Sequence, residues 1–414
     1  MFRKLFAPVA LALSLFTAPL YANTEMWVSA AEIAAWDTSA VADTGKFYPI
    51  SRIARFAMSG TDIGLPSAYR GENYNARVGD QNNNAESIAL ACAIYYQATG
   101  GTWAQTKGKN ILLAVGADIS SSNGALSPGR NLTGYVIAAD LLDLSSSDST
   151  AFASIVLDIL ARNYGGFGTP SGWPTGTLLA CAARRPQNWG AYCLSSVTAA
   201  AAWLNRPTLL DTCWVLFQDF VGRYPTVYAQ FDFQDGGSQQ TETYSSTPNQ
   251  LRPIAPACEV VDGHNVDGAI IDDWSRSTGG FHWPFYSCEG SGNIYQWDSL
   301  EGLTAAAEIL YRKGYDSWGA QDNALLRTAE FFWRMHLLFP TPTTAGTGGV
   351  CQDTSHGGYW WPSGVALKDV HEDNHAETFI SLINKRYGKN FLLRPPSNGT
   401  RAGYNVSFTD WTHQ

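Results

Sequence analysis

A succession of helix-forming segments, separated by long irregular connections, is the feature that most limits what this chain can fold into. Apolar residues recur three or four positions apart, as on one face of a helix, whereas the alternation typical of strands is scarce. Because proline interrupts a helix, Arg206-Pro207 predicts the turn of a helical hairpin. The expected helices are Ala85–Ala98, Lys109–Ala117, Gly134–Leu144, Thr150–Asn163, Asn188–Leu204, Thr208–Val221, Asp298–Lys313, Asn323–Leu338 and Asp373–Arg386.

The connections between these segments are rich in glycine, proline and aromatic residues. They are Tyr164–Gly176, Pro225–Asp262, Ser275–Asn293 and Pro340–Pro362. Loops of this length inside a compact domain usually carry function. We therefore expect an all-α fold, an (α/α) toroid or incomplete α/α barrel, in which long aromatic-rich loops form a substrate cleft. No linker or strict repeat marks a second domain, so residues 23–414 are expected to form one domain.

The N-terminus has the pattern of a secretory signal peptide. Arg3 and Lys4 precede an apolar run from Leu5 to Phe16, and a helix-breaking stretch then ends at Ala22. We expect residues 1–22 to be removed and the protein to be periplasmic or extracellular. No later segment is long and apolar enough to span a bilayer, so no membrane partner is expected.

Composition narrows the classes of function. With 27 Lys and Arg against 36 Asp and Glu, the net charge is −9, which argues against a nucleic-acid partner. The hydrophobic fraction of 45% against 15% charged residues excludes a disordered chain. The chain contains 15 Trp, 19 Tyr and 19 Phe, a content that suits both large cores and aromatic platforms for sugars. We expect a monomer.

The seven cysteines would stand in an oxidising compartment after export. Their odd number leaves at least one unpaired, and the short spacings suggest the pairs Cys181/Cys193 and Cys258/Cys288. No paired CxxC motif is present, so a structural zinc site is not expected, and no cofactor is predicted.

The segment Arg184-Arg185-Pro186-Gln187-Asn188-Trp189 opens one expected helix. Asn188 can act as a helix cap, or its amide can face an anionic group at the positive end of the helix. Arg184 and Arg185 favour the second role, because a guanidinium binds a carboxylate through two hydrogen bonds.

Two further segments supply groups for proton transfer. His264 lies between glycine and asparagine, a setting typical of a turn or of acid–base chemistry. Tyr295 lies where a glycine-rich loop meets a helix, where it either packs or acts chemically. A tyrosine, a histidine and an amide or arginine suffice for β-elimination from a uronic acid. The carboxylate is neutralised, a base removes the C5 proton, and an acid protonates the departing glycosidic oxygen.

Three segments resemble the alginate-lyase-domain superfamily of polysaccharide lyases. Asn188–Leu204 is similar to its QNWGAW-type helix, Tyr295–Leu310 to its tyrosine-bearing helix, and His371–Gly388 to its closing helix. The closest groups are polysaccharide lyase family 38 and then family 5. The resemblance implies an (α/α) toroid that cleaves an acidic polysaccharide, alginate or glucuronan, by β-elimination without an essential metal.

The resemblance also implies residue roles. Asn188 would neutralise the uronate carboxylate, His264 would assist neutralisation or proton removal, and Tyr295 would be the general base, the general acid or both. The chain departs from family 5 at Trp189, where that family has histidine, and no arginine shortly precedes Tyr295. Arg276, Arg184 or Arg185 would have to replace the arginine.

The remaining candidates are substrate contacts in the aromatic-rich loops and at helix starts. Each is a tryptophan, a histidine or another polar residue of the kind that binds oligosaccharides, although each also suits a structural role. They are Asn83, Trp189, Trp274, Arg276, His282, Glu289, Trp360, Trp361, His371 and His375.

Two other enzyme classes stay open, besides a glycan-binding protein without activity. An (α/α) glycoside hydrolase would use Asp272, Asp273 or Asp298 together with Glu301 or Glu372 as its paired carboxylates. A zinc peptidase would use His371-Glu372-Asp373-Asn374-His375, which matches HExxH. No third ligand follows at the expected place, so the prediction assigns no metal.

Overall fold

A computed structural model describes much of the helical part of the chain. The described residues are 24–36, 85–115, 124–165, 176–233, 252–261, 264–270, 272–273, 292–338, 352–353, 358–359, 377–391, 406 and 408–413.

This part of the protein is mostly helical, which confirms the all-α prediction. In chain order the helices are α1 (Ala30–Ala34), α3 (Ala85–Thr99), α4 (Thr102–Leu113), α5 (Leu126–Leu141), α6 (Ser146–Ala161), α7 (Leu178–Arg184), α8 (Asn188–Trp203), α9 (Pro207–Phe220), α11 (Gly292–Arg312), α12 (Ala320–Leu338), α13 (Glu377–Tyr387) and α14 (Thr409–Thr412). Two antiparallel hairpins, β1 (Val260–Val261) with β2 (His264–Asn265) and β3 (Gln352–Asp353) with β4 (Gly358–Tyr359), are the strands of the described residues.

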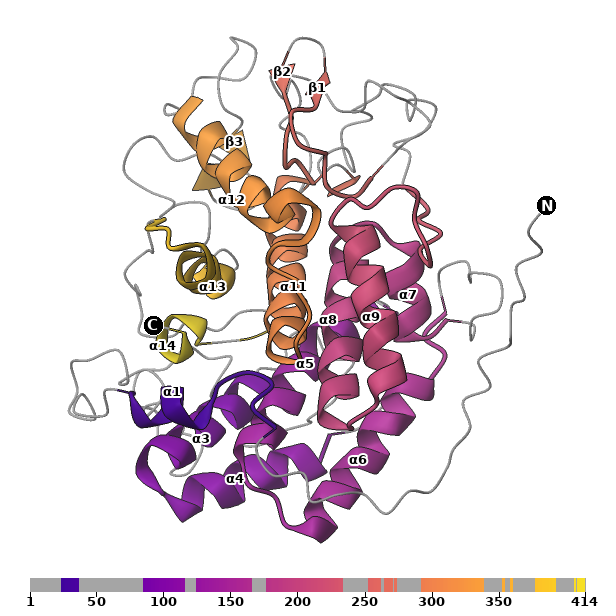
Figure 1. Ribbon diagram of the computed structural model, residues 1–414. Coiled ribbons are helices and arrows are strands. Elements are labelled where there is room, and N and C mark those ends of the chain that lie inside the picture. The colour runs from indigo at the N-terminus through magenta and orange to yellow at the C-terminus, as the bar shows by residue number, and fades with distance from the viewer. Residues whose placement is uncertain are drawn as a thin grey trace.

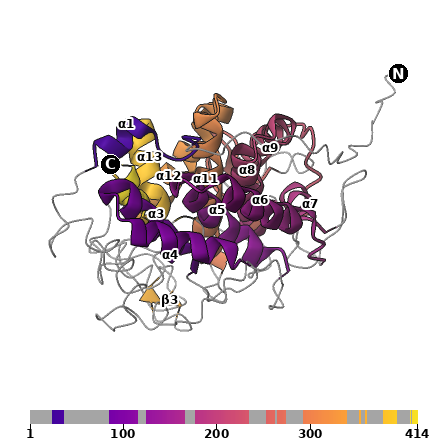
Figure 2. The same ribbon diagram turned by 90° about the horizontal axis from the view of Figure 1, so that it is seen from below.

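Helix α11 stands upright in the middle of the molecule, with α8 and α9 on one side and α12 and α13 on the other (Figure 1). Seen from below, α5, α8 and α11 lie toward the middle, with α1 and α13 on one side and α7 and α9 on the other (Figure 2).

Helices α8 and α11 run side by side in the same direction. Asn188 contacts Asp298 near the start of both helices, and Tyr192 contacts Glu301 one turn further along. Gly302 lies at the closest approach, where an added Cβ would be 2.7 Å from the carbonyl carbon of Ala191. Only glycine allows these two backbones to pack so closely.

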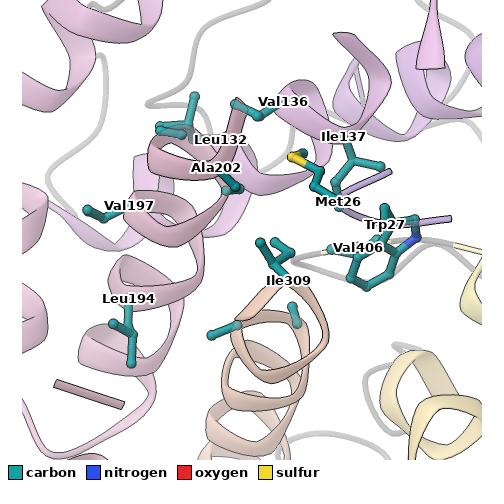
Figure 3. Close-up of a cluster of buried hydrophobic side chains, with 14 of the residues drawn as sticks. Met26, Trp27, Leu132, Val136, Ile137, Leu194, Val197, Ala202, Ile309 and Val406 are labelled. Carbon is teal, nitrogen blue, oxygen red and sulfur yellow. The ribbon is translucent and has the colours of Figure 1, made fainter. Parts of the chain in front are cut away.

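Helix α5 meets α8 in its N-terminal half. The Ser196 hydroxyl donates a hydrogen bond to the Gly129 carbonyl at 2.7 Å, and the Cys193 thiol approaches the Ala125 carbonyl at 3.6 Å. Further along, α5, α8 and α11 together line an apolar cluster with Met26, Trp27 and Val406 (Figure 3). The three helices therefore share one general direction.

The predicted hairpin of α8 and α9 is confirmed. Pro207 is the first residue of α9, where its missing N–H is not needed. The end of α9 returns to the start of α8, because a Cβ at Gly190 would lie 3.1 Å from the ring of Phe220.

Several helix starts were predicted too late, among them that of α6, which was expected at Thr150 and lies at Ser146. The helix expected from Lys109 begins at Thr102, the one expected from Gly134 begins at Leu126, and the one expected from Asp298 begins at Gly292. In α5, Pro128 lies in the first turn, where a helix tolerates proline, so it did not mark a boundary.

The cysteine pairing also needs correction. Cys181 and Cys193 are both buried free thiols that form a hydrogen bond and no disulfide, where α7 packs on α8. Cys258 is a free, exposed thiol, and its expected partner Cys288 lies outside the described residues. Within the described residues, no helix is long and apolar enough to cross a membrane.

Candidate functional site

Buried polar side chains gather where the N-terminal halves of α5, α8 and α11 meet, an unusual density for the inside of a helical protein. We call this group the helix-end cluster. It consists of Arg130, Gln187, Asn188, Tyr192, Asp272, Asp273, Asp298, Ser299 and Glu301, all of them buried.

One oxygen of the Asp298 carboxylate, on α11, accepts hydrogen bonds from both α5 and α8. Oδ2 of Asp298, on α11, accepts a hydrogen bond from Nη2 of Arg130 on α5 at 3.0 Å. The same oxygen accepts a bond from Nδ2 of Asn188 on α8 at 3.2 Å. The Asn188 amide is oriented at its other end too, because its Oδ1 accepts from the backbone N–H of Trp189 at 2.9 Å. An arginine and an amide are thus held side by side.

A second carboxylate caps helix α8 from a distant part of the chain. Oδ2 of Asp273 accepts the backbone N–H of Asn188 at 2.9 Å and also the hydroxyl of Ser299. A negative charge is favourable at this end of a helix, where N–H groups lack intrahelical partners. Asn188 is therefore the first helical residue and not the cap. The cap position belongs to Gln187, whose side chain makes no capping bond.

Tyr192 completes the cluster on the α8 side. Its hydroxyl donates to Glu301 at 2.8 Å, and the guanidinium of Arg130 lies 5.2 Å from its ring centre. Burial, and then the charges of Asp298 and Glu301, raise the pKa of Tyr192 well above 10. Tyr192 therefore stays protonated as a donor, and its ring gives Arg130 a cation–π contact.

The side-chain amide of Gln187 is fully buried. Neither its oxygen nor its nitrogen makes a hydrogen bond. Leaving a buried polar group unpaired costs about 1–3 kcal/mol. An amide kept at that cost beside Asn188 is suited to pair with a ligand.

The structure places the backbone of Tyr295 and His264. Tyr295 lies in the first turn of α11, one turn before Asp298, where the sequence predicted the junction of a loop and a helix. His264 lies in β2, paired with Val261, and not in a free loop. Just after this hairpin, Asp267 forms an ion pair with Arg327 of α12. The side chains of Tyr295 and His264 are outside the described residues.

Three predicted contacts lie around the start of α8. Arg184 donates to the Gln230 carbonyl at 3.0 Å and lies 3.5 Å from the carboxylate of Asp232. Arg185 is the C-cap of α7 and is half-buried. Trp189 is also half-buried and packs on the core.

The other predicted contacts lie outside the described residues. They are Asn83, Trp274, Arg276, His282, Glu289, Trp360, Trp361, His371 and His375. In the described part of the chain, no group of three His, Cys, Asp or Glu side chains is arranged to hold a metal ion.

Arg130 was not among the predicted site residues. It stands in a helix whose other residues are mainly apolar or small, LSPGRNLTGYVIAADL, and a lone arginine in such a helix signals a buried pair. Because the helix was expected to begin at Gly134, Arg130 lay outside the expected helices, although it belongs to the first turns of α5.

A search against models of known protein families finds no match to this chain, and a search of curated proteins finds no similar sequence.

Proposed function

We propose that the protein is a polysaccharide lyase that cleaves a uronic-acid polymer, alginate or glucuronan, by β-elimination. The observation that carries this proposal is the carboxylate of Asp298, which holds Arg130 beside Asn188 one helical turn after Tyr295. We propose that Arg130 takes the role of the arginine that the sequence lacks shortly before Tyr295.

In the proposed reaction, Arg130 and the Asn188 amide neutralise the uronate carboxylate. A guanidinium has five N–H donors and an amide nitrogen has two, so both can bond Asp298 and a ligand together. Neutralisation makes the C5 proton acidic. Tyr295 removes that proton or protonates the departing glycosidic oxygen, and His264 assists. The start of α8 adds a favourable dipole for a negative group.

The proposed framework is an (α/α) toroid. Its support is that α5, α8 and α11 share one direction while α9 returns against α8, as inner and outer helices of a toroid do. We further propose that the mature chain, residues 23–414, is one exported, monomeric domain whose loops form a cleft at the helix-end cluster.

A glycoside hydrolase is the second candidate, because the cluster also gathers Asp273, Asp298 and Glu301. In the structure each of these carboxylates accepts a hydrogen bond from a protein donor: Asp273 from the start of α8, Asp298 from Arg130 and Asn188, and Glu301 from Tyr192. This favours a role in positioning those groups over a role as catalytic acid or base.

The two functions leave different products. β-Elimination creates a conjugated double bond that absorbs ultraviolet light, whereas hydrolysis releases saturated reducing ends. We would incubate the protein with polymers of mannuronate, guluronate and glucuronate, with and without a chelator, and record both signals.

Tyr295→Phe and Arg130→Gln are the test variants, and Tyr311→Phe, an exposed tyrosine near the other end of α11, is the matched control. The proposal expects absorbance that the chelator and Tyr311→Phe leave intact and both test variants abolish. Reducing ends without absorbance would establish the hydrolase instead, and peptide cleavage that the chelator stops would establish the zinc peptidase.

A further inference from the structure

The loop that follows α9 exposes three large side chains. Tyr224 and Tyr228 are each 44% exposed and Val227 is 58% exposed. Among the described residues only two other large hydrophobic side chains are exposed, Val260 and Tyr311, and they lie on other elements. We call residues 223–229 the platform loop. Apolar exposure concentrated on one loop marks a binding surface more often than exposure scattered over the molecule.

Hydrogen bonds to the buried carboxylate of Asp219 hold the backbone of the platform loop in place. Asp219, fully buried in α9, accepts the backbone N–H of Tyr228 and of Ala229 at 2.9 Å each, and that of Val227 at 3.0 Å. It also accepts Nε of Arg223 at 2.8 Å. A single buried carboxylate thus fixes the backbone of the loop, so little conformational freedom remains to be lost when a ligand binds.

The loop lies next to the helix-end cluster. Phe220, at the end of α9, reaches the start of α8 at Gly190. After the loop, the chain pairs with the end of α7, where the N–H of Gln230 donates to Ala183 at 2.9 Å. Helix α7 ends just before Asn188. The exposed tyrosines therefore stand at the same end of the molecule as the cluster.

The side chain of Arg252 places a positive charge beside the platform loop. The guanidinium of Arg252 lies 5.3 Å from the ring centre of Tyr224. Among the described residues no carboxylate forms an ion pair with Arg252, and its buried Nε has no hydrogen-bond partner. An aromatic ring beside an arginine suits a ligand that has both a flat apolar face and a negative charge. A uronic-acid residue has both.

We propose that Tyr224, Tyr228 and Arg252 form an outer subsite that binds the acidic polysaccharide beyond the residues being cleaved. The tyrosine rings stack on the apolar faces of sugar rings, and Arg252 pairs with a uronate carboxylate. The proposal rests on the proposed uronan substrate and adds a role that the reaction itself does not require.

The test compares long and short substrates. In the double variant Tyr224→Ala/Tyr228→Ala we expect KM for the polymer to rise about tenfold, which corresponds to about 1.4 kcal/mol for the loss of both stacking contacts. We expect kcat to stay unchanged, as well as KM for the shortest oligosaccharide that is cleaved. Tyr311→Ala, which removes a tyrosine of similar exposure from α11, should leave both KM values unchanged.

Arg252→Gln separates charge from stacking, and we expect it to weaken the dependence of polymer KM on salt concentration. We expect each variant to keep the wild-type melting temperature, because the substituted side chains are partly exposed. Measuring it shows that a change in KM does not come from a folding defect. If the protein cleaves a uronan and the double variant keeps the wild-type KM for the polymer, the subsite is refuted while the lyase stands.

If no uronan is cleaved, the lyase fails and the subsite is tested by electrophoresis through gels containing alginate or glucuronan. Retardation of the wild type that the double variant loses supports the subsite. Equal mobility of the two proteins overturns it.

Discussion

Replacing Asp298 by asparagine tests the arrangement on which the proposed site depends. The side chain keeps its shape but loses its charge. Arg130 then loses its ion pair inside the protein, and the Asn188 amide faces a neutral group. Breaking a buried ion pair by removing one partner costs about 3–5 kcal/mol.

That cost translates into a measurable change in melting temperature. For a chain of 414 residues the entropy of unfolding is about 0.9 kcal/mol/K, so the variant should melt about 3–6 °C lower. The exposed pair of Asp158 with Arg162 offers a matched control, since the Asp158 side chain is 59% exposed. Asp158→Asn should change stability by less than about 0.5 kcal/mol and leave the melting temperature almost unchanged.

Melting followed by circular dichroism checks the stability, and the uronan assay is then run well below the lower melting temperature. We expect Asp298→Asn to lose activity there, although the protein is folded, because Arg130 and Asn188 are no longer held in place. A variant that melts with the wild type would refute the buried pair. A destabilised variant with full activity would refute the link between the pair and catalysis.

The remaining predictions concern three other buried groups. Gln187→Met removes the unpaired amide, so we expect a melting temperature about 1–3 °C higher and a higher KM; a stability no greater than that of the wild type would contradict the unpaired state. Burial alone would raise the pKa of the Glu308 carboxyl, but His413 beside it and the hydrogen bonds from Arg386 and Arg312 hold that pKa below the usual range. Its contribution to stability is therefore present above about pH 4.5 and is lost on acidification. In Glu308→Gln the urea midpoint should fall near neutral pH and depend less on pH below about 4.5, and an unchanged midpoint would count against this. Burial raises the pKa of Asp140 to about 6, so its contribution is full below the unfolded value of 3.8 and falls by roughly 3 kcal/mol as the pH rises through 6. Asp140→Asn should remove that part of the pH dependence in urea titrations at several pH values, and identical profiles would show that Asp140 does not titrate in this range.

The sequence predicted the helices well where apolar spacing and proline coincide, as in α8 and α9. It placed the start of α5 too late, at Gly134, although the helix already begins at Leu126 and holds Pro128 in its first turn, where proline is tolerated. The sequence placed Tyr295 at the junction of a glycine-rich loop and a helix, and its backbone lies in the first turn of α11.

The hydrogen bonds and ion pairs that join the residues of the helix-end cluster could not be predicted from the sequence. Asp273 caps α8 from 85 residues away, and Arg130 meets Asp298 from a separation of 168 residues. Local patterns report neighbours within a helical turn or two, whereas these contacts depend on how helices pack. Gly302 shows the same limit, because its need to be glycine arises only from the backbone of Ala191.

The counter-charge of Asp298 has a consequence for the substrate. A buried arginine without a partner destabilises the free protein, so the carboxylate keeps Arg130 charged and oriented before any ligand arrives. The same carboxylate competes with a uronate for the guanidinium and repels its negative charge. A single sugar acid should therefore bind weakly at the cluster. Affinity must come from contacts further along the polymer, and the platform loop beside α7 supplies them. A lyase built in this way would favour long chains over short ones.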